Sequence, residues 1–174
     1  MYGLATDPLN AERLSVLKRR PPDKHVQLLV PDGSWLDRVG MPGDAALALA
    51  DAFWPGPLTL VVAAGPQAPP SVVAHGTIGV RVPAHPVALE LLARTGPLAA
   101  SSANRSGEPT PATAEGIRAL FGSHVDAYLD GGTIGLSGSG SGSTVVDVTG
   151  STLRILRTGG VPPGEVERVV RGPI

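Results

Sequence analysis

The sequence predicts an α/β fold in which a single domain holds a mixed, twisted and open β-sheet flanked by helices. Short apolar segments typical of strands alternate irregularly with segments of helical character. Residues 58–63 are apolar almost throughout, as expected for a strand that is covered on both faces. A chain of 174 residues with 42% hydrophobic and 17% charged residues can bury a sizeable core within one domain.

The individual elements follow from caps, breakers and apolar runs. Asp7 and Pro8 begin the first predicted helix as its cap and first-turn residue. Pro55-Gly56-Pro57 ends the helix predicted at residues 45–53. The predicted helices are residues 7–19, 45–53, 86–94, 112–121 and 163–170. The predicted strands are residues 26–30, 58–63, 78–82, 97–100, 125–129, 144–148 and 153–156, the last two as a hairpin. Residues 1–4 look like the tail of a longer segment and are assigned to no strand.

Composition excludes several classes of function. A net charge of −1 argues against strong nonspecific binding of nucleic acid, although a local basic cleft is allowed. The absence of cysteine excludes disulfides, thiolate catalysis and cysteine-bound zinc, and it fits a reducing cytoplasm. No signal pattern and no membrane-length apolar run is present, so we expect a cytoplasmic protein without membrane contact. The four histidines lack ligand spacing, and no metal site is predicted.

The string Ser101-Ser102-Ala103-Asn104-Arg105-Ser106-Gly107-Glu108-Pro109 carries most of the functional information. It follows an apolar strand, and its small side chains let a polar ligand approach the backbone. A plain polar turn is the alternative. No His or Asp is adjacent, and the Gly-x-Ser-x-Gly elbow of hydrolases is missing, so Ser102 is interpreted as a ligand donor and not as a nucleophile.

A cationic cluster at the end of the first predicted helix suits a phosphate-bearing ligand. Lys18 supplies a point charge and Arg20 a bidentate fork, and Lys24 extends the cluster. The alternative is a solvated helix C-terminus stabilised by the helix dipole.

Three further features have two interpretations each. Arg81 lies inside an apolar strand, either in an internal ion pair or as the anchor for an anionic ligand. The Gly/Ser tract at residues 131–142 is a surface loop or a lid with Ser143 at its hinge. Arg157, at a strand end before a Gly turn, is a surface residue or a ligand contact.

Taken together, seven segments resemble the YrdC/TsaC family of threonylcarbamoyl-AMP synthases, in the order of that family. They are YGLA, Lys18-x-Arg20-Pro21, FWPGPLTLV at residues 53–61, GTIGVRVPAHP at 76–86, SSANRSGEPTP at 101–111, STVVD at 143–147 and ILRTGG at 155–160. The resemblance implies a YrdC-like domain over residues 1–174 that lacks the family's first strand and helix. It also lacks the Thr-containing string before Tyr2. The His that commonly follows the Lys-x-Arg loop aligns with Leu29.

The resemblance implies a reaction in which L-threonine, bicarbonate and ATP give threonylcarbamoyl-AMP and pyrophosphate. The product would pass to a complex that modifies adenosine in tRNA, with weak or no direct tRNA binding by this chain. ATP would come with Mg²⁺ as a substrate, and no tightly bound cofactor is expected. The implied catalytic tetrad is Lys18, Arg20, Ser102 and Asn104. The implied ATP contacts are Arg20, Lys24, Thr77, Ser102, Thr110 and Arg157, and the implied threonine contacts are Arg81, Ala100 and Ser143.

Two other functions remain open on the sequence. A YrdC-type carbamoyl-adenylate transferase would share these motifs, but such domains normally stand beside others that generate carbamoyl phosphate. A noncatalytic RNA-binding module would need stacking platforms, and aromatic residues make up only 3% of the chain.

Overall fold

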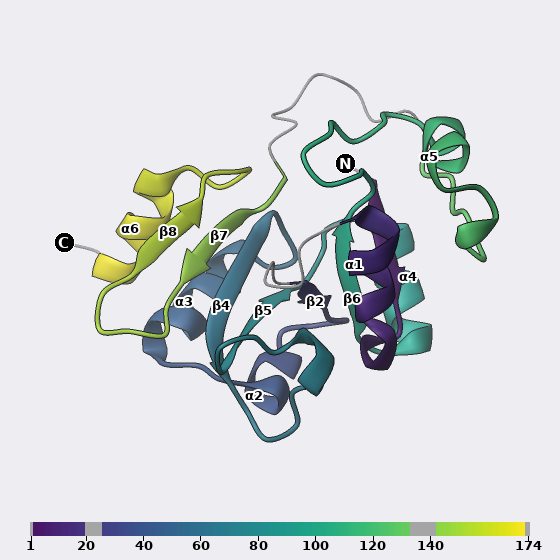
Figure 1. The fold of residues 1–174 in the computed structure, drawn as a ribbon. Coiled ribbons are helices and arrows are strands. Elements are labelled where there is room, and N and C mark those ends of the chain that lie inside the picture. Colours follow the sequence, from purple (N-terminus) through teal and green to yellow (C-terminus); the bar gives the residue numbers. More distant parts are fainter. Residues whose placement is uncertain (1, 20–25, 133–141, 173–174) are drawn as a thin grey trace.

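One mixed β-sheet forms the centre of the computed structural model, which describes residues 2–19, 26–132 and 142–172 (Figure 1). Its strands follow the order β1-β6-β2-β5-β4-β7-β8, and β3 pairs with β4. The pairs β2-β5 and β4-β7 are parallel and the others antiparallel. The bounds are β1 Gly3–Thr6, β2 Gln27–Leu29, β3 Gly40–Met41, β4 Leu58–Ala64, β5 Thr77–Arg81, β6 Leu98–Ser102, β7 Thr144–Asp147 and β8 Arg154–Arg157. The predicted class, a mixed open sheet flanked by helices, is confirmed.

The helices begin and end at residues suited to those positions. The α-helices in the described ranges are α1 Glu12–Lys18, α2 Trp35–Val39, α3 Asp44–Phe53, α4 Pro86–Thr95, α5 Ala114–Phe121 and α6 Pro163–Arg171. Short 3₁₀ helices cover Pro8–Asn10, Pro70–Val72 and Gly122–His124. Thr113 caps α5 by accepting the Gly116 N–H at 3.1 Å, and Gly96 ends α4 with a φ of +78°. In Figure 1, α1 and α4 stand beside β6, and α5 lies apart from the sheet.

Side chains alternate between two unlike faces along the central strands. The even-numbered residues of β2, β4, β5 and β7 form the core, with Leu28, Leu58, Leu60, Val62, Ile78, Val80 and Val146 at most 1% exposed. Odd-numbered residues of the same strands, most of them small or polar, line a cavity on the other face: Gln27, Thr59, Val61, Thr77, Gly79, Arg81 and Val145. The apolar run at residues 58–63 is therefore covered by core on one face only.

The β7-β8 hairpin is confirmed, and Asp147 holds its turn. The Asp147 carboxylate accepts hydrogen bonds from the backbone N–H of Thr149 at 3.0 Å and from its hydroxyl at 2.6 Å. It also pairs with the Arg154 guanidinium. Burial alone would raise the pKa of Asp147, but the Thr149 hydrogen bonds and the Arg154 charge outweigh it, so the pKa lies below its usual value.

Most predicted elements are found within a few residues of their expected bounds, and one strand prediction is wrong. Residues 125–129 form no strand, because Tyr128 folds back locally instead of meeting a neighbouring strand. Its hydroxyl donates to the Gly122 carbonyl at 2.6 Å, and its ring lies under the Arg118 guanidinium at 4.4 Å. The first strand, β1, was not expected, since four residues carry little pattern; β1 pairs with β6 along Gly3–Thr6. Helix α2 and strand β3 were not expected either.

No helix in these described ranges combines the length and apolar composition required to cross a bilayer. The Gly/Ser tract predicted at residues 131–142 falls largely outside them, at residues 133–141.

We expect Asp147→Asn to destabilise the fold by about 1–3 kcal/mol near neutral pH, because charged hydrogen-bond acceptors contribute this much. The pKa of Asp147 is lowered in the folded state. Its contribution is therefore complete above the unfolded pKa of about 4 and is lost as the pH falls through the lowered folded value. Urea unfolding of both proteins between pH 7 and pH 2 measures this, and a difference that persists at the acid end would contradict the assignment.

Candidate functional site

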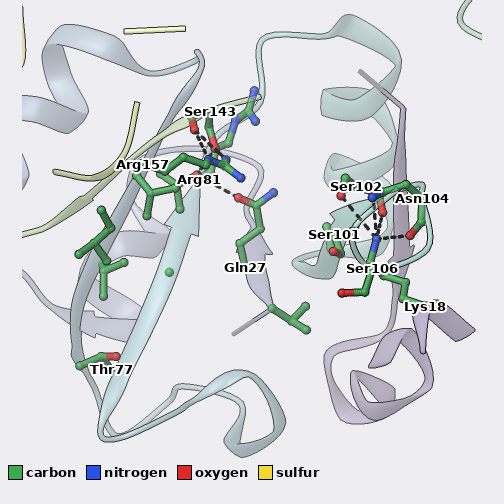
Figure 2. A pocket seen from close by; sticks show the side chains of 18 residues that line it. Lys18, Gln27, Thr77, Arg81, Ser101, Ser102, Asn104, Ser106, Ser143 and Arg157 are labelled. Atoms are coloured by element: carbon green, nitrogen blue, oxygen red, sulfur yellow. Dashed lines mark hydrogen bonds between the residues drawn. The ribbon is translucent and has the colours of Figure 1, made fainter. Parts of the chain in front are cut away.

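A cavity of about 340 Å³ opens on the polar face of the sheet. Residues from six strands line it, together with the C-terminal end of α1 and the loop after β6 (Figure 2). The lining residues are Lys18, Val26, Gln27, Thr59, Val61, Thr77, Gly79, Arg81, Ala100, Ser101, Ser102, Asn104, Ser106, Gly107, Ser143, Val145, Leu156 and Arg157. Two groups of polar side chains stand on opposite sides of it, as Figure 2 shows.

The first group is built around Lys18, whose side chain is only 2% exposed. Its ammonium Nζ donates to the carbonyls of Ser102 and Asn104 and lies 3.1 Å from Asn104 Oδ1. Ser102 Oγ is a further oxygen at 3.4 Å. Buried cations need such polar neighbours to replace water. Lys18 is thus no solvated helix end, and it joins α1 to the loop that follows β6.

Asn104 fixes the rest of that loop. Its Nδ2 donates to the carbonyls of Arg105 at 2.8 Å and Glu108 at 2.6 Å, while the Ser106 N–H donates to the Lys18 carbonyl at 3.0 Å. The amide therefore bridges Lys18 and the loop backbone. These bonds place Ser102, Ser106 and Gly107 at the cavity wall.

The second group contains two guanidinium groups. Arg81 Nε donates to the Gly56 carbonyl at 2.9 Å, and no described Asp or Glu forms an ion pair with Arg81 or Arg157. Burial, and secondarily the like charge of Arg157, lower the pKa of Arg81. The internal ion pair considered for Arg81 is therefore not found among the described residues, and the pair of cations can accept an anion.

A line of hydrogen bonds joins this second group to the floor of the cavity. Arg157 Nη2 donates to Ser143 Oγ at 3.0 Å, and Ser143 Oγ lies 2.7 Å from Thr59 Oγ1. The Thr59 hydroxyl donates to Gln27 Oε1 at 2.9 Å. Because that single Thr59 proton is given to Gln27, Ser143 donates to Thr59. The direction of every bond from Arg157 to Gln27 is therefore determined.

Arg157 is held by the backbone as well. Its Nε and Nη2 donate to the Ser143 carbonyl at 3.0 and 2.7 Å. The buried Thr144 hydroxyl donates to the Val161 carbonyl and accepts the N–H groups of Gly159 and Val161. A Cβ on Gly159 would lie 2.4 Å from backbone atoms of Ser143 and Thr144, so only glycine permits this approach.

The cavity brings together most of the residues that the sequence singled out. Lys18, Thr77, Arg81, Ala100, Ser102, Asn104, Ser143 and Arg157 all line it. Thr110 lies in the loop between β6 and α5 and does not line it. Arg20 and Lys24 fall outside the described residues. Sequence reasoning missed Gln27 and Thr59, whose signal was a polar residue at alternate positions of an otherwise apolar strand.

The arrangement suits an anionic ligand with more than one charged group. It offers guanidinium and ammonium groups on two sides and hydroxyl donors between them. No group of three His, Asp or Glu side chains able to hold a metal ion gathers anywhere in residues 2–19, 26–132 or 142–172. Phosphoryl or carboxylate chemistry by positioning and charge neutralisation fits such a site.

Comparison with known proteins gives one consistent result. Residues 1–159 match the Sua5/YciO/YrdC family model, which is described as "Telomere recombination". A putative threonylcarbamoyl-AMP synthase of Mycobacterium tuberculosis is 44% identical over 98% of this chain and 79% of that protein. The threonylcarbamoyl-AMP synthase of Pyrococcus abyssi is 36% identical over 98% of this chain, and the match covers 51% of that protein.

The structural comparison agrees with the sequence comparison. The crystal structure of P. abyssi Sua5 complexed with L-threonine superimposes with a TM-score of 0.88 at 35% identity, covering 97% of this chain and 50% of that one. The chain therefore spans about half the length of the P. abyssi protein.

We expect Gly159→Ala to destabilise the fold by about 1–3 kcal/mol, the usual range for overpacking, because the new Cβ meets backbone that cannot move aside. Gly150→Ala is the matched control, since its nearest neighbours lie 3.9 and 4.0 Å away in the β7-β8 turn. Thermal unfolding compares the two. Equal stability of both variants would show that the 159–161 segment is not packed as described.

Proposed function

Because this chain belongs to the Sua5/YciO/YrdC family, we propose that it is a threonylcarbamoyl-AMP synthase, a nucleotidyltransferase acting on L-threonine, bicarbonate and ATP. The supporting observation in this molecule is the cavity, where Arg81 and Arg157 have no described acidic partner and face the Lys18 group across the sheet. One relative with this name matches almost the whole chain, and a related structure is a complex with L-threonine.

In the proposed reaction the threonine amine takes up bicarbonate with loss of water to give an N-carboxylate. One oxygen of that group attacks the α-phosphorus of ATP, and the bond from this phosphorus to the bridging oxygen breaks, releasing pyrophosphate. No covalent enzyme intermediate is needed, so the protein acts by orientation and charge neutralisation. ATP arrives as its Mg²⁺ complex, with the ion held by phosphates and water.

The two polar groups of the cavity divide the work in this proposal. Arg81 pairs with the threonine carboxylate, Ser143 contacts threonine, and Ala100 leaves room beside it. Lys18 and the Ser102–Asn104 loop face the phosphates, with Arg157 and Thr77 as further ATP contacts. The roles of Arg20, Lys24 and Thr110 stay predictions from the resemblance.

The proposal extends to the setting of the reaction. The adenylate would be handed to a separate complex that modifies adenosine in tRNA, in the cytoplasm, with little direct contact between this chain and tRNA. A net charge of −1 agrees with weak tRNA affinity.

The first test is pyrophosphate release from ATP by the whole chain. We expect release that requires both L-threonine and bicarbonate, and Lys18→Met should reduce its rate by about a hundredfold or more, the usual cost of removing one charge-stabilising donor. Lys18 also holds the loop after β6, so the melting temperature must be measured alongside. A folded variant with unchanged turnover would contradict the role of Lys18. Release from carbamoyl phosphate and ATP without threonine would support the carbamoyl-adenylate alternative instead.

A second test separates threonine binding from ATP binding. Arg81→Gln should raise the KM for threonine by about 10- to 100-fold, the value of a charge-assisted hydrogen bond, and change the KM for ATP little. Arg94→Gln is the matched control, since Arg94 pairs with Glu90 on the exposed side of α4. If Arg81→Gln raises the KM for threonine and the KM for ATP equally, Arg81 is not a specific contact of threonine.

A further inference from the structure

Gln27 occupies a central place in the cavity that neither the motifs nor the relatives assign. It lies on β2, between β5 with Arg81 and β6 with Ser102, so it stands on the strand that separates the two polar groups. Its neighbour on β5 is Gly79, which has no side chain. The Gln27 side chain passes over this glycine and reaches Thr59 on β4.

The orientation of the Gln27 amide follows from that contact. Oε1 accepts the Thr59 hydroxyl at 2.9 Å, which turns Nε2 the other way. Figure 2 shows the nitrogen of Gln27 on the side away from that hydrogen bond, toward the open space before the Lys18 group. Among the described residues no acceptor is bonded to Nε2. The amide therefore presents N–H donors to the cavity.

We propose that Gln27 positions the N-carboxylate of the amino-acid substrate by donating a hydrogen bond from Nε2 to its non-attacking oxygen. This inference rests on the proposed function. With threonine anchored at Arg81 and the phosphates near Lys18, the carboxylated nitrogen lies between them, and β2 is the strand beneath that region. The line of bonds from Arg157 through Ser143 and Thr59 holds the amide in this orientation.

A neutral donor suits this step better than a cation would. The N-carboxylate is a weak nucleophile, and a full positive charge at its oxygens would lower its reactivity further. An amide N–H fixes the group while leaving the charge on the attacking oxygen, so the alignment with phosphorus improves without neutralising the nucleophile.

Steady-state pyrophosphate release with bicarbonate as the varied substrate tests the proposal. Gln27→Leu removes the donor and should lower kcat/KM for bicarbonate about tenfold or more. Gln27→Glu keeps an acceptor for Thr59 but places an anion against the N-carboxylate, so a larger loss is expected, about a hundredfold. The KM for ATP should stay within about twofold in both variants.

Gln67→Glu is the matched control, because Gln67 is exposed and does not line the cavity, and the charge change is the same. Wild-type kinetics for bicarbonate in both Gln27 variants would overturn the role of Gln27 and leave the proposed function standing. Equal losses for bicarbonate and ATP with a lowered melting temperature would also overturn it, as a purely structural role. No release by the wild-type chain would overturn the proposed function and this inference together.

Discussion

The alternation of side chains along the central strands is the constraint on which the rest of the structure depends. One face of the sheet carries the branched aliphatic residues of the core, and the opposite face carries glycine, hydroxyl, amide and guanidinium groups. A one-residue slip of β5 would bury Arg81 in the core and expose Val80 to the cavity. The same register that stabilises the fold therefore determines which residues can meet a ligand.

The cationic side chains of the site lie at two separate places along the sheet. Lys18 is stabilised by carbonyls of the loop after β6, while Arg81 and Arg157 lie on the β5 and β8 side and repel each other. Two like charges are held close only because other contacts position them: Gly56 for Arg81, and Ser143 for Arg157. A bound anion would relieve this repulsion, so part of the attraction for the ligand comes from the way the fold places the two guanidinium groups.

Sequence reasoning reached the class of fold, and most of the site residues it predicted line the cavity, because those residues sit in strong local patterns such as the Ser102-x-Asn104 string. Prediction from the sequence failed where contacts between distant residues determine the secondary structure or the burial of a side chain. Val125 and Tyr128 read as strand residues, but Tyr128 bonds locally to Gly122. β1 is too short to predict and exists through pairing with β6. For Lys18 the sequence allowed a solvated helix end or a phosphate ligand, and only the structure shows that the residue is buried. Gln27 had no motif around it.

The placement of β1 has a consequence for how the chain folds. Its partner β6 is almost a hundred positions further on, with Gly3 opposite Ser102, and the Tyr2 hydroxyl donates to Asp130 across a separation of 128 residues. Pairings of this kind require a large loop to close first, which slows folding. During synthesis on the ribosome, β1 emerges first and stays unpaired until β6 has been made. Its edge is open to other chains for as long as that takes.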